Sequence, residues 1–260
     1  MYMLISPAKK LDESPQVNPT AIPITEPELL GRADELARIM QRKAPDEIAA
    51  LMKLSDKLAE LNFERYQAWE VPFPEERTKP AVFMFRGDVY QGLDADTLKP
   101  SGLQYAQRHL GILSGLYGLL RPLDRILPYR LEMGTRLENP AGKDLYAFWG
   151  EAVTGLVNER LAASGSRQLV NLASNEYWKA VDANRIEGEV ITPVFKDWKN
   201  GQYKIISFHA KKARGMMVRW AIDHQVQDAE ELKYFDYGGY GFAPELSDEK
   251  NWVFTRRQEA

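Results

Sequence analysis

Apolar residues are arranged along this chain in two patterns. Short apolar runs predict buried strands, and apolar residues spaced three or four apart predict amphipathic helices. Residues 2–5 form a short apolar run typical of a buried strand. Over 29–40 the apolar residues recur every three or four positions, the spacing of one helix face. The same reasoning predicts further strands over 81–85, 169–172, 189–196, 202–208 and 252–255, and further helices over 46–52, 55–69, 103–120, 144–161, from 173–176 onward, and 210–225.

Turn residues complete this outline. Asn200-Gly201, between the strands expected over 189–196 and 202–208, is a strong hairpin signal. Thr25 and Glu28 resemble a capping box before the helix over 29–40, and the four prolines of 12–27 predict an irregular segment. Helices separate only some strands, and no repeat or linker is visible. We therefore expect an α+β (mixed α/β) fold in one domain over 1–260, with a central sheet and surrounding helices.

The segment 111–134 combines glycines with arginines. Gly111, Gly115 and Gly118 fit one face of the helix expected over 103–120. Each costs a helix roughly 1 kcal/mol relative to alanine, so the pattern indicates that another backbone comes close there. Pro122 would end this helix. Guanidinium groups among packed apolar residues need a counter-charge, which either the protein or a ligand supplies; the arginines concerned are Arg121, Arg125 and Arg130.

Composition excludes several classes of protein. At 260 residues, with 44% hydrophobic and 27% charged residues, the chain resembles an ordinary globular protein. It has no cysteine, which excludes disulfides, thiolate metal sites and cysteine nucleophiles. The N-terminal apolar run is too short for a signal peptide or a membrane span. We therefore expect a cytoplasmic location and no membrane partner.

The net charge of −3 is unevenly distributed. Residues 198–222 contain six Lys or Arg and no Asp or Glu, whereas acidic residues dominate 223–260. This arrangement favours a local positive patch on a mildly acidic protein. The alternative is that the two blocks neutralise each other in the fold.

Cations at the start of the helix over 210–225 suggest an anion site. Lys211, Lys212 and Arg214 lie near its expected N-terminus, where they oppose the helix dipole and where free backbone amides favour an anion. A bound phosphate would relieve both problems; the alternative is a solvated, charged first turn.

Other cations follow predicted strands, namely Lys9, Arg86 and Lys179. Ligand sites of α/β sheets gather beyond the carboxyl ends of strands. All these cations could therefore line one cleft with Arg121, Arg125 and Arg130, although each could also be a plain surface charge. Nearby aromatic rings could stack on bases or belong to the core; they are Tyr90, Tyr117, Tyr129 and Tyr177.

Signals for catalysis are weak. His209 is a candidate catalytic residue, although a lone histidine is usually structural. Glu132 and Asp144 are candidate acid/base groups or metal ligands, beside Asp88 and Glu176, with ion pairing to arginines as the alternative. The three histidines lack metal-ligand spacing, and no phosphate-binding loop or dinucleotide fingerprint is present. We expect no metal and no cofactor.

Ten segments of the chain resemble the YaaA family of bacterial peroxide-stress proteins. They run in order over nearly the whole sequence: Ile5-Ser-Pro-Ala-Lys9, Leu54-Ser-Asp-Lys-Leu58, Gly87-Asp-Val-Tyr90, Leu113-Ser-Gly-Leu-Tyr-Gly118, Leu120-Arg-Pro-Leu-Asp124, Pro128-Tyr-Arg-Leu-Glu-Met-Gly134, Gly142-Lys-Asp-Leu-Tyr146, Phe148-Trp-Gly150, Asn171-Leu-Ala-Ser174 and Ala210-Lys-Lys-Ala-Arg-Gly215.

The resemblance implies a cytoplasmic protein of unusual single-domain topology that protects against peroxide damage. It also implies binding of duplex, bubble-containing and branched DNA through a positive cleft and a helix-hairpin-helix element. The two helices expected over 46–69 are the candidate for that element. Lys53, Ser55 and Lys57 could contact phosphate there, but the turn lacks the glycines usual in such hairpins.

Two functional hypotheses follow. In the first, the protein binds DNA without sequence specificity in the peroxide response, because lysine and arginine contacts to phosphate orient DNA without reading bases. In the second, it is an enzyme that acts on a phosphorylated nucleotide or damaged DNA in the same cleft, with Glu132 or Asp144 as acid/base or metal ligand. Iron handling would require a carboxylate site. The sequence leaves the oligomeric state open.

Overall fold

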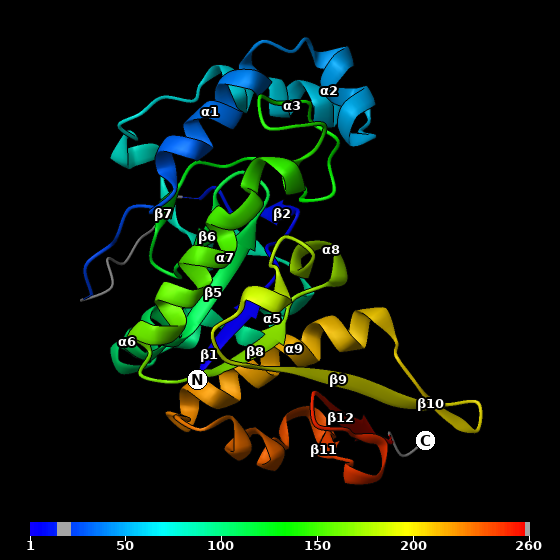
Figure 1. Cartoon of the computed structure of the whole chain (residues 1–260). Helices are drawn as coiled ribbons and strands as arrows, with labels where there is room; N and C mark the ends of the chain where they lie inside the picture. The colour runs from blue at the N-terminus through cyan, green and yellow to red at the C-terminus, as the bar shows by residue number, and fades with distance from the viewer. Residues whose placement is uncertain (15–21, 258–260) are drawn as a thin grey trace.

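The computed structural model describes residues 1–14 and 22–257. At its centre lies a mixed sheet of eight strands within the described chain (Figure 1). Its order is β11 (Gly241–Phe242), β12 (Asn251–Arg256), β9 (Glu189–Lys199), β8 (Gln168–Leu172), β1 (Tyr2–Ile5), β5 (Leu110–Ser114) and β6 (Gly118–Leu120), with β10 (Gln202–Lys204) paired to β9. The middle strands are parallel: β1 pairs with β5 and β8, and β9 pairs with β8 and β12.

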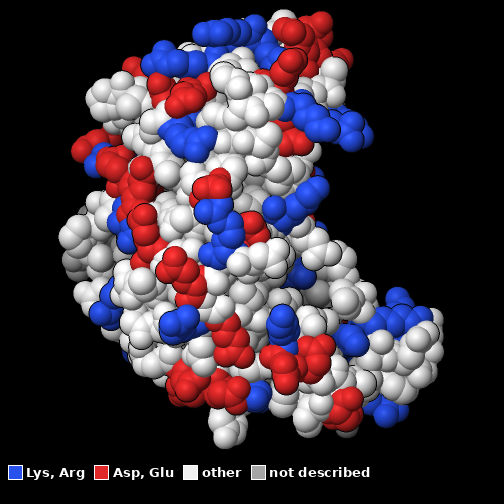
Figure 2. Space-filling model, in the orientation of Figure 1, with Lys and Arg blue, Asp and Glu red and all other residues white. Residues whose placement is uncertain are grey.

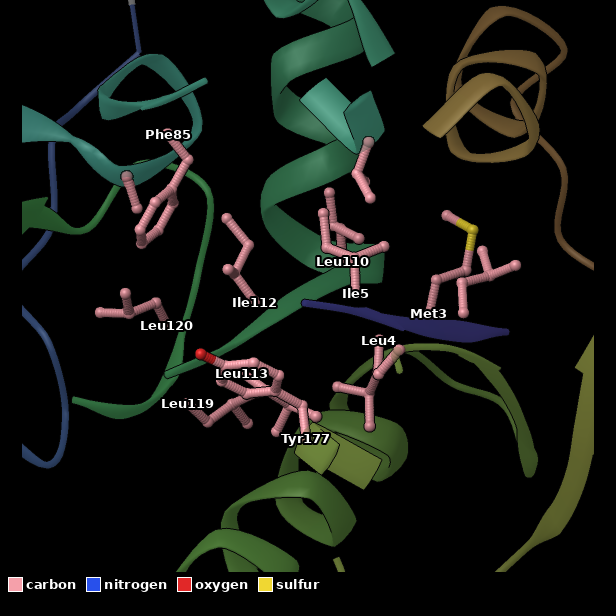
Figure 3. Close-up of a cluster of buried hydrophobic side chains, with 14 of the residues drawn as sticks. Met3, Leu4, Ile5, Phe85, Leu110, Ile112, Leu113, Leu119, Leu120 and Tyr177 are labelled. Atoms are coloured by element: carbon pink, nitrogen blue, oxygen red, sulfur yellow. The ribbon is translucent and has the colours of Figure 1, made fainter. Parts of the chain in front are cut away.

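Helices cover both faces of this sheet. α6 (Pro100–His109) and α9 (Ser207–Asp223) contact β1, whereas α7 (Leu145–Ala163) contacts β6. Figure 3 shows Met3 and Ile5 on one side of β1 and Leu4 on the other. Both sets are buried. A parallel strand covered on both faces needs apolar residues at every position, which explains the uninterrupted run at 2–5.

A second group of helices packs at one end of the molecule (Figure 1). It consists of α1 (Leu30–Gln41), α2 (Pro45–Met52) and α3 (Asp56–Gln67), with α3 in contact with both of the others. The helices predicted over 29–40 and 46–69 are therefore confirmed. The capping box is wrong, because the Thr25 hydroxyl donates to Asp124 at 2.6 Å and α1 begins only at Leu30.

Short elements join these layers. Two small sheets pair β2 (Lys10–Leu11) with β4 (Phe85–Arg86) and β3 (Lys79–Pro80) with β7 (Arg125–Ile126). The short α-helices are α4 (Ala81–Met84), α5 (Asp88–Leu93) and α8 (Asn175–Trp178). Short 3₁₀ helices occur at Glu75–Arg77, Ala95–Thr97, Ala183–Arg185, Ala229–Tyr234, Tyr237–Gly239 and Pro244–Leu246.

The glycine-faced helix over 103–120 is wrong. α6 ends at His109, and the chain then forms β5, a tight turn and β6. Glycines three and four residues apart fit this hairpin equally well: Gly118 has φ +75°, in the left-handed region. The inferred close approach does occur, because a Cβ on Gly115 would lie 2.2 Å from the Leu131 carbonyl oxygen.

Two further predictions need correction. Residues 81–84 form the helical turn α4 and only 85–86 are extended, because periodicity cannot separate a short buried strand from a buried helical turn. The strand predicted over 202–208 ends at Lys204, and α9 begins at Ser207. The irregular segment predicted over 12–27 is confirmed where it is described, because residues 12–14 and 22–27 form no helix. Residues 15–21 lie outside the described chain. The structure confirms the Asn200-Gly201 turn, with positive φ at both residues.

Candidate anion-binding cleft

A cleft of about 460 Å³ lies beyond the carboxyl ends of β1 and β8. Five segments line it: 6–10 after β1, 86–90 at the start of α5, the loop 129–132, 174–177 at α8, and Lys211 with Arg214 on α9. Its elements lie between the α1–α3 layer and the β9–β10 hairpin (Figure 1). Figure 2 shows the molecule hollowed on this side, with Lys and Arg along the margins of the hollow.

Two serines at strand ends form the floor of the cleft. The Ser174 amide donates to the Ser6 hydroxyl at 2.9 Å, and the two hydroxyl oxygens lie 3.3 Å apart. The Tyr90 hydroxyl donates to the Ser6 carbonyl at 3.0 Å. Burial raises the pKa of Tyr90, Tyr129 and Tyr177 well above the usual value, so these phenols are neutral at physiological pH.

A close contact between α5 and α9 sets the positions of two walls of the cleft. α5 packs on α9, and a Cβ on Gly92 would lie 2.1 Å from the Lys212 carbonyl oxygen. The contact places the start of α5, with Asp88, beside the second turn of α9, with Lys211 and Arg214. Sequence reasoning missed Gly92, because a single glycine gives no periodic signal.

The cations that line the cleft differ in their partners. Arg86 pairs with Asp12 at 2.8 Å and Asp96 at 2.9 Å. Glu132 lies 2.5 Å from the Lys9 ammonium and 3.5 Å from the Arg130 guanidinium. In these three cases the protein itself supplies a counter-charge.

Arg214 and Lys211 are different. Within residues 1–14 and 22–257, neither has a carboxylate at ion-pair distance. Arg214 is half-buried, and the loss of solvent lowers the pKa of its guanidinium. A desolvated cation without a counter-ion is costly, so the half-buried Arg214, unlike the exposed Lys211, favours a bound anion at this wall of the cleft.

Three carboxylates also line the cleft. Glu132 is committed to Lys9 and Arg130, and Glu176 accepts a hydrogen bond from the Gly134 amide at 2.9 Å. The Asp88 carboxylate has no hydrogen bond or ion pair to any described residue. It is the unused acceptor of the site.

The structure separates the other predicted cations from this cleft. Arg121 pairs with the buried Asp124 at 2.8 Å and with Glu28, and Arg125 pairs with Glu26 at 2.6 Å. The protein therefore supplies the counter-charge that their setting demanded, and no ligand is needed at either.

Lys179 lies over the Tyr146 ring at 4.7 Å, in a separate depression. Lys212 borders another depression, with Arg219 and Asp223. Lys53 ends α2 and Lys57 lies in α3; both are exposed, and a phosphate contact through them stays a prediction.

The helix-terminus argument for an anion site needs correction. α9 begins at Ser207, three residues before the predicted start, so Lys211, Lys212 and Arg214 lie in its second turn rather than beside the free amides. The acidic block leaves this region unneutralised: in the part of the chain that the structure describes, only Arg219 of the basic block pairs with it, through Asp223 at 2.9 Å.

Of the three candidate catalytic residues, only Glu132 lines the cleft. Asp144 caps α7 by accepting the Ala147 amide at 2.9 Å and does not line the cleft. His209 lies outside the cleft, with its Nδ1 3.4 Å from the buried Asp197 carboxylate. Glu132 lines the cleft but serves two cations. Among the described residues, no three His, Asp or Glu side chains gather as metal ligands.

The predicted base-stacking tyrosines belong to the core. Tyr117 is fully buried, and Tyr90, Tyr129 and Tyr177 expose 8% or less of their surface. Sequence reasoning missed Ser6 and Ser174; their position directly after buried strands was the available signal.

Five segments that carry the family resemblance line the cleft: 5–9, 87–90, 128–134, 171–174 and 210–215. None of the helices in the described residues combines the length and apolarity that a bilayer crossing requires.

A UPF0246 protein of Azoarcus sp. (strain BH72) is 55% identical over 264 residues, covering all of both chains. Another, from Neisseria gonorrhoeae (strain NCCP11945), is 52% identical over 260 residues, covering all of this chain and 99% of its own. A third, from Shewanella sp. (strain ANA-3), is 54% identical over the full length of both. The family model described as peroxide stress protein YaaA matches residues 1–246. The chain therefore belongs to the YaaA family of peroxide stress proteins.

Proposed function

We propose that this cleft and the hollow around it bind the phosphate backbone of DNA, without sequence specificity, as part of the peroxide stress response. The observation that carries the proposal is the pair Lys211 and Arg214, which face the cleft without a carboxylate partner among the described residues. A polyanion supplies the missing charge. The chain is acidic overall, so this local excess of cations is not a general property of its surface.

The β9–β10 hairpin extends the binding surface. It forms one margin of the hollow (Figure 2) and carries Lys199 and Lys204, both exposed and without an ion pair to any described residue. Lysine contacts of this kind hold a phosphate backbone in place without distinguishing bases. Duplex, bubble-containing and branched DNA all present such a backbone, and association with DNA protection or repair follows as part of the proposal.

Fluorescence anisotropy with a labelled 20-base-pair duplex tests the proposal. Lys211→Gln and Arg214→Gln remove cations from the cleft, whereas Lys212→Gln removes an adjacent cation that lies outside it. We expect each of the first two to weaken binding about tenfold or more, in the range that one charge-assisted contact contributes, and the control to stay within twofold. Equal affinity of all four proteins would contradict the proposal.

Parallel titrations with a bubble-containing duplex and a four-way junction test the lack of structural preference. A similar loss on all three DNA forms is expected, because the contacts are to phosphate. A cleft variant that lost only one form would contradict a general phosphate surface.

A further inference from the structure

We infer that the inner end of the cleft is a pocket for one nucleotide that carries a terminal phosphate, either free in solution or at the end of a nucleic acid strand. This inference deepens the proposed function and rests on it for the nature of the ligand. Three features of the cleft support it: the charge of its cation pair, its closed floor, and the free Asp88 carboxylate.

The cation pair matches a phosphate monoester better than a diester. Lys211 and Arg214 are three residues apart on α9, so their side chains leave the same face of the helix. Both line the cleft, and neither has a carboxylate partner within the described chain. A phosphate monoester carries nearly two negative charges at pH 7, whereas a backbone diester carries one. Two unpaired cations side by side therefore favour the terminal group.

The shape of the cleft favours a strand end over a continuous strand. Ser6, Ser174 and the buried tyrosines close its inner side through the hydrogen bonds described above. Its volume of about 460 Å³ lies within the range, roughly 300–1,000 Å³, of pockets that hold small molecules. Such a pocket accommodates one nucleotide.

The remaining lining distinguishes a nucleotide from inorganic phosphate. Pro7, Ala8, Val89 and Leu131 provide apolar surface for a sugar or a base. The Asp88 carboxylate repels phosphate and accepts hydrogen bonds, so it suits the hydroxyl or amino groups of a nucleoside. A site for inorganic phosphate alone has no use for either feature.

Isothermal titration with each of the four deoxynucleoside 5′-monophosphates, with the matching nucleosides and with inorganic phosphate tests the pocket directly. We expect at least one monophosphate to bind ten times more tightly than its nucleoside and than inorganic phosphate. Arg214→Gln should weaken that binding at least tenfold. Asp88→Asn should also weaken binding of the monophosphate, because a hydrogen-bond acceptor for the nucleoside changes, but it should leave the binding of inorganic phosphate unchanged or make it tighter. Lys212→Gln serves as the matched control and should bind like the wild type. A thermal melt of each variant shows that it is folded.

Competition with short single strands identifies the source of the ligand. Displacement of the monophosphate by 5′-phosphorylated but not 5′-hydroxyl strands indicates a strand end, and a failure of both strands to compete indicates a free nucleotide; either result supports the pocket. Absence of binding by all four monophosphates at millimolar concentration overturns it.

A covalently closed circular duplex separates this inference from the proposed function, because it has no strand ends. Binding of the circle without any binding of monophosphates leaves the DNA-binding proposal standing and removes the pocket. Binding of monophosphates without any binding of the circle does the reverse.

Discussion

Gly215 of α9 lies against Val89 of α5 so closely that a Cβ on Gly215 would stand 1.7 Å from the Val89 carbonyl oxygen. This contact fixes the crossing of two helices that both line the cleft, with Asp88 at the start of one and Arg214 on the other. The geometry of the proposed anion site thus depends on a residue that does not line the cleft.

Gly215→Ala should therefore destabilise the protein strongly. The obstacle is backbone, which cannot rotate away as a side chain does, and we expect a loss of about 3 kcal/mol or more in the free energy of unfolding. Gly155→Ala in α7 is the control, since a Cβ there meets nothing within 4 Å. It should stabilise the protein by up to about 1 kcal/mol. Urea denaturation measures both, and equal stabilities would refute the account of the α5–α9 contact.

Arg214→Gln should raise the thermal stability of the unliganded protein. The substitution removes a desolvated guanidinium that has no carboxylate partner in the described chain. Relief of about 1 kcal/mol corresponds to a Tm increase of about 2–4 °C. A protein that gains stability as it loses ligand affinity is the expected signature of a binding residue.

Arg256→Gln provides the contrast for Arg214. Arg256 donates to the buried Asp197 carboxylate at 2.7 Å, and its loss leaves that charge with the Tyr240 hydroxyl at 2.8 Å and His209 at 3.4 Å but without a guanidinium. Differential scanning calorimetry should show a loss of about 3 kcal/mol or more. A drop in Tm for Arg214→Gln as large as that for Arg256→Gln would show that Arg214 has an internal role instead.

Asp12 should make stability depend on pH in the acidic range. The Ser14 hydroxyl, Arg86 and Lys79 hold the pKa of this carboxyl well below its usual value of 3.8. Because the folded-state pKa is lowered, the stabilisation is complete above about pH 4–5 and is lost as the pH falls further. Asp12→Asn should be less stable than the wild type at pH 7, and this difference should narrow below pH 4.

Asp96→Asn is the control for Asp12, since it removes the more exposed partner of the same Arg86. An exposed ion pair contributes roughly 0–1 kcal/mol, so its melting curve should change little. A stability difference between Asp12→Asn and the wild type that stayed constant from pH 7 to pH 3 would contradict the assignment.

Lys53→Gly tests the turn between α2 and α3. Lys53 has φ 53°, in the left-handed region that glycine adopts without strain. Glycine should raise the free energy of unfolding by about 1 kcal/mol. The variant also removes an ammonium group from the candidate helix-hairpin-helix element. Weaker duplex binding by this more stable variant would support a phosphate contact at the turn, and unchanged affinity would argue against one.

Local patterns predicted the elements in which apolar residues form a continuous run or recur at a regular spacing. The strands at 2–5, 169–172 and 189–196 and the helices at 29–40 and 46–69 depend on apolar periodicity alone, and the structure confirms them. The helix predicted across Gly111 and Gly118 is wrong, because glycine is equally suited to a tight hairpin and to a close contact between helices. Only the tertiary partners, Leu131 and Tyr2, distinguish the two.

Some residues of the site were also predictable from local sequence patterns. Placing cations after buried strands identified Lys9 and Arg86, and the basic block identified Lys211 and Arg214. The partners of each cation could not be predicted, because Arg121 finds Glu28 across more than ninety positions of sequence. Which guanidinium remains unpaired depends on the completed fold.

The salt dependence of duplex binding tests the central claim most directly. Each phosphate neutralised contributes a slope of about −0.9 to the plot of log association constant against log salt concentration. We predict a slope of about −3 or steeper for the wild-type protein, flattened by about 0.9 in Lys211→Gln and unchanged in Lys212→Gln. A slope near zero, or the same slope for all three proteins, would contradict a phosphate-binding cleft.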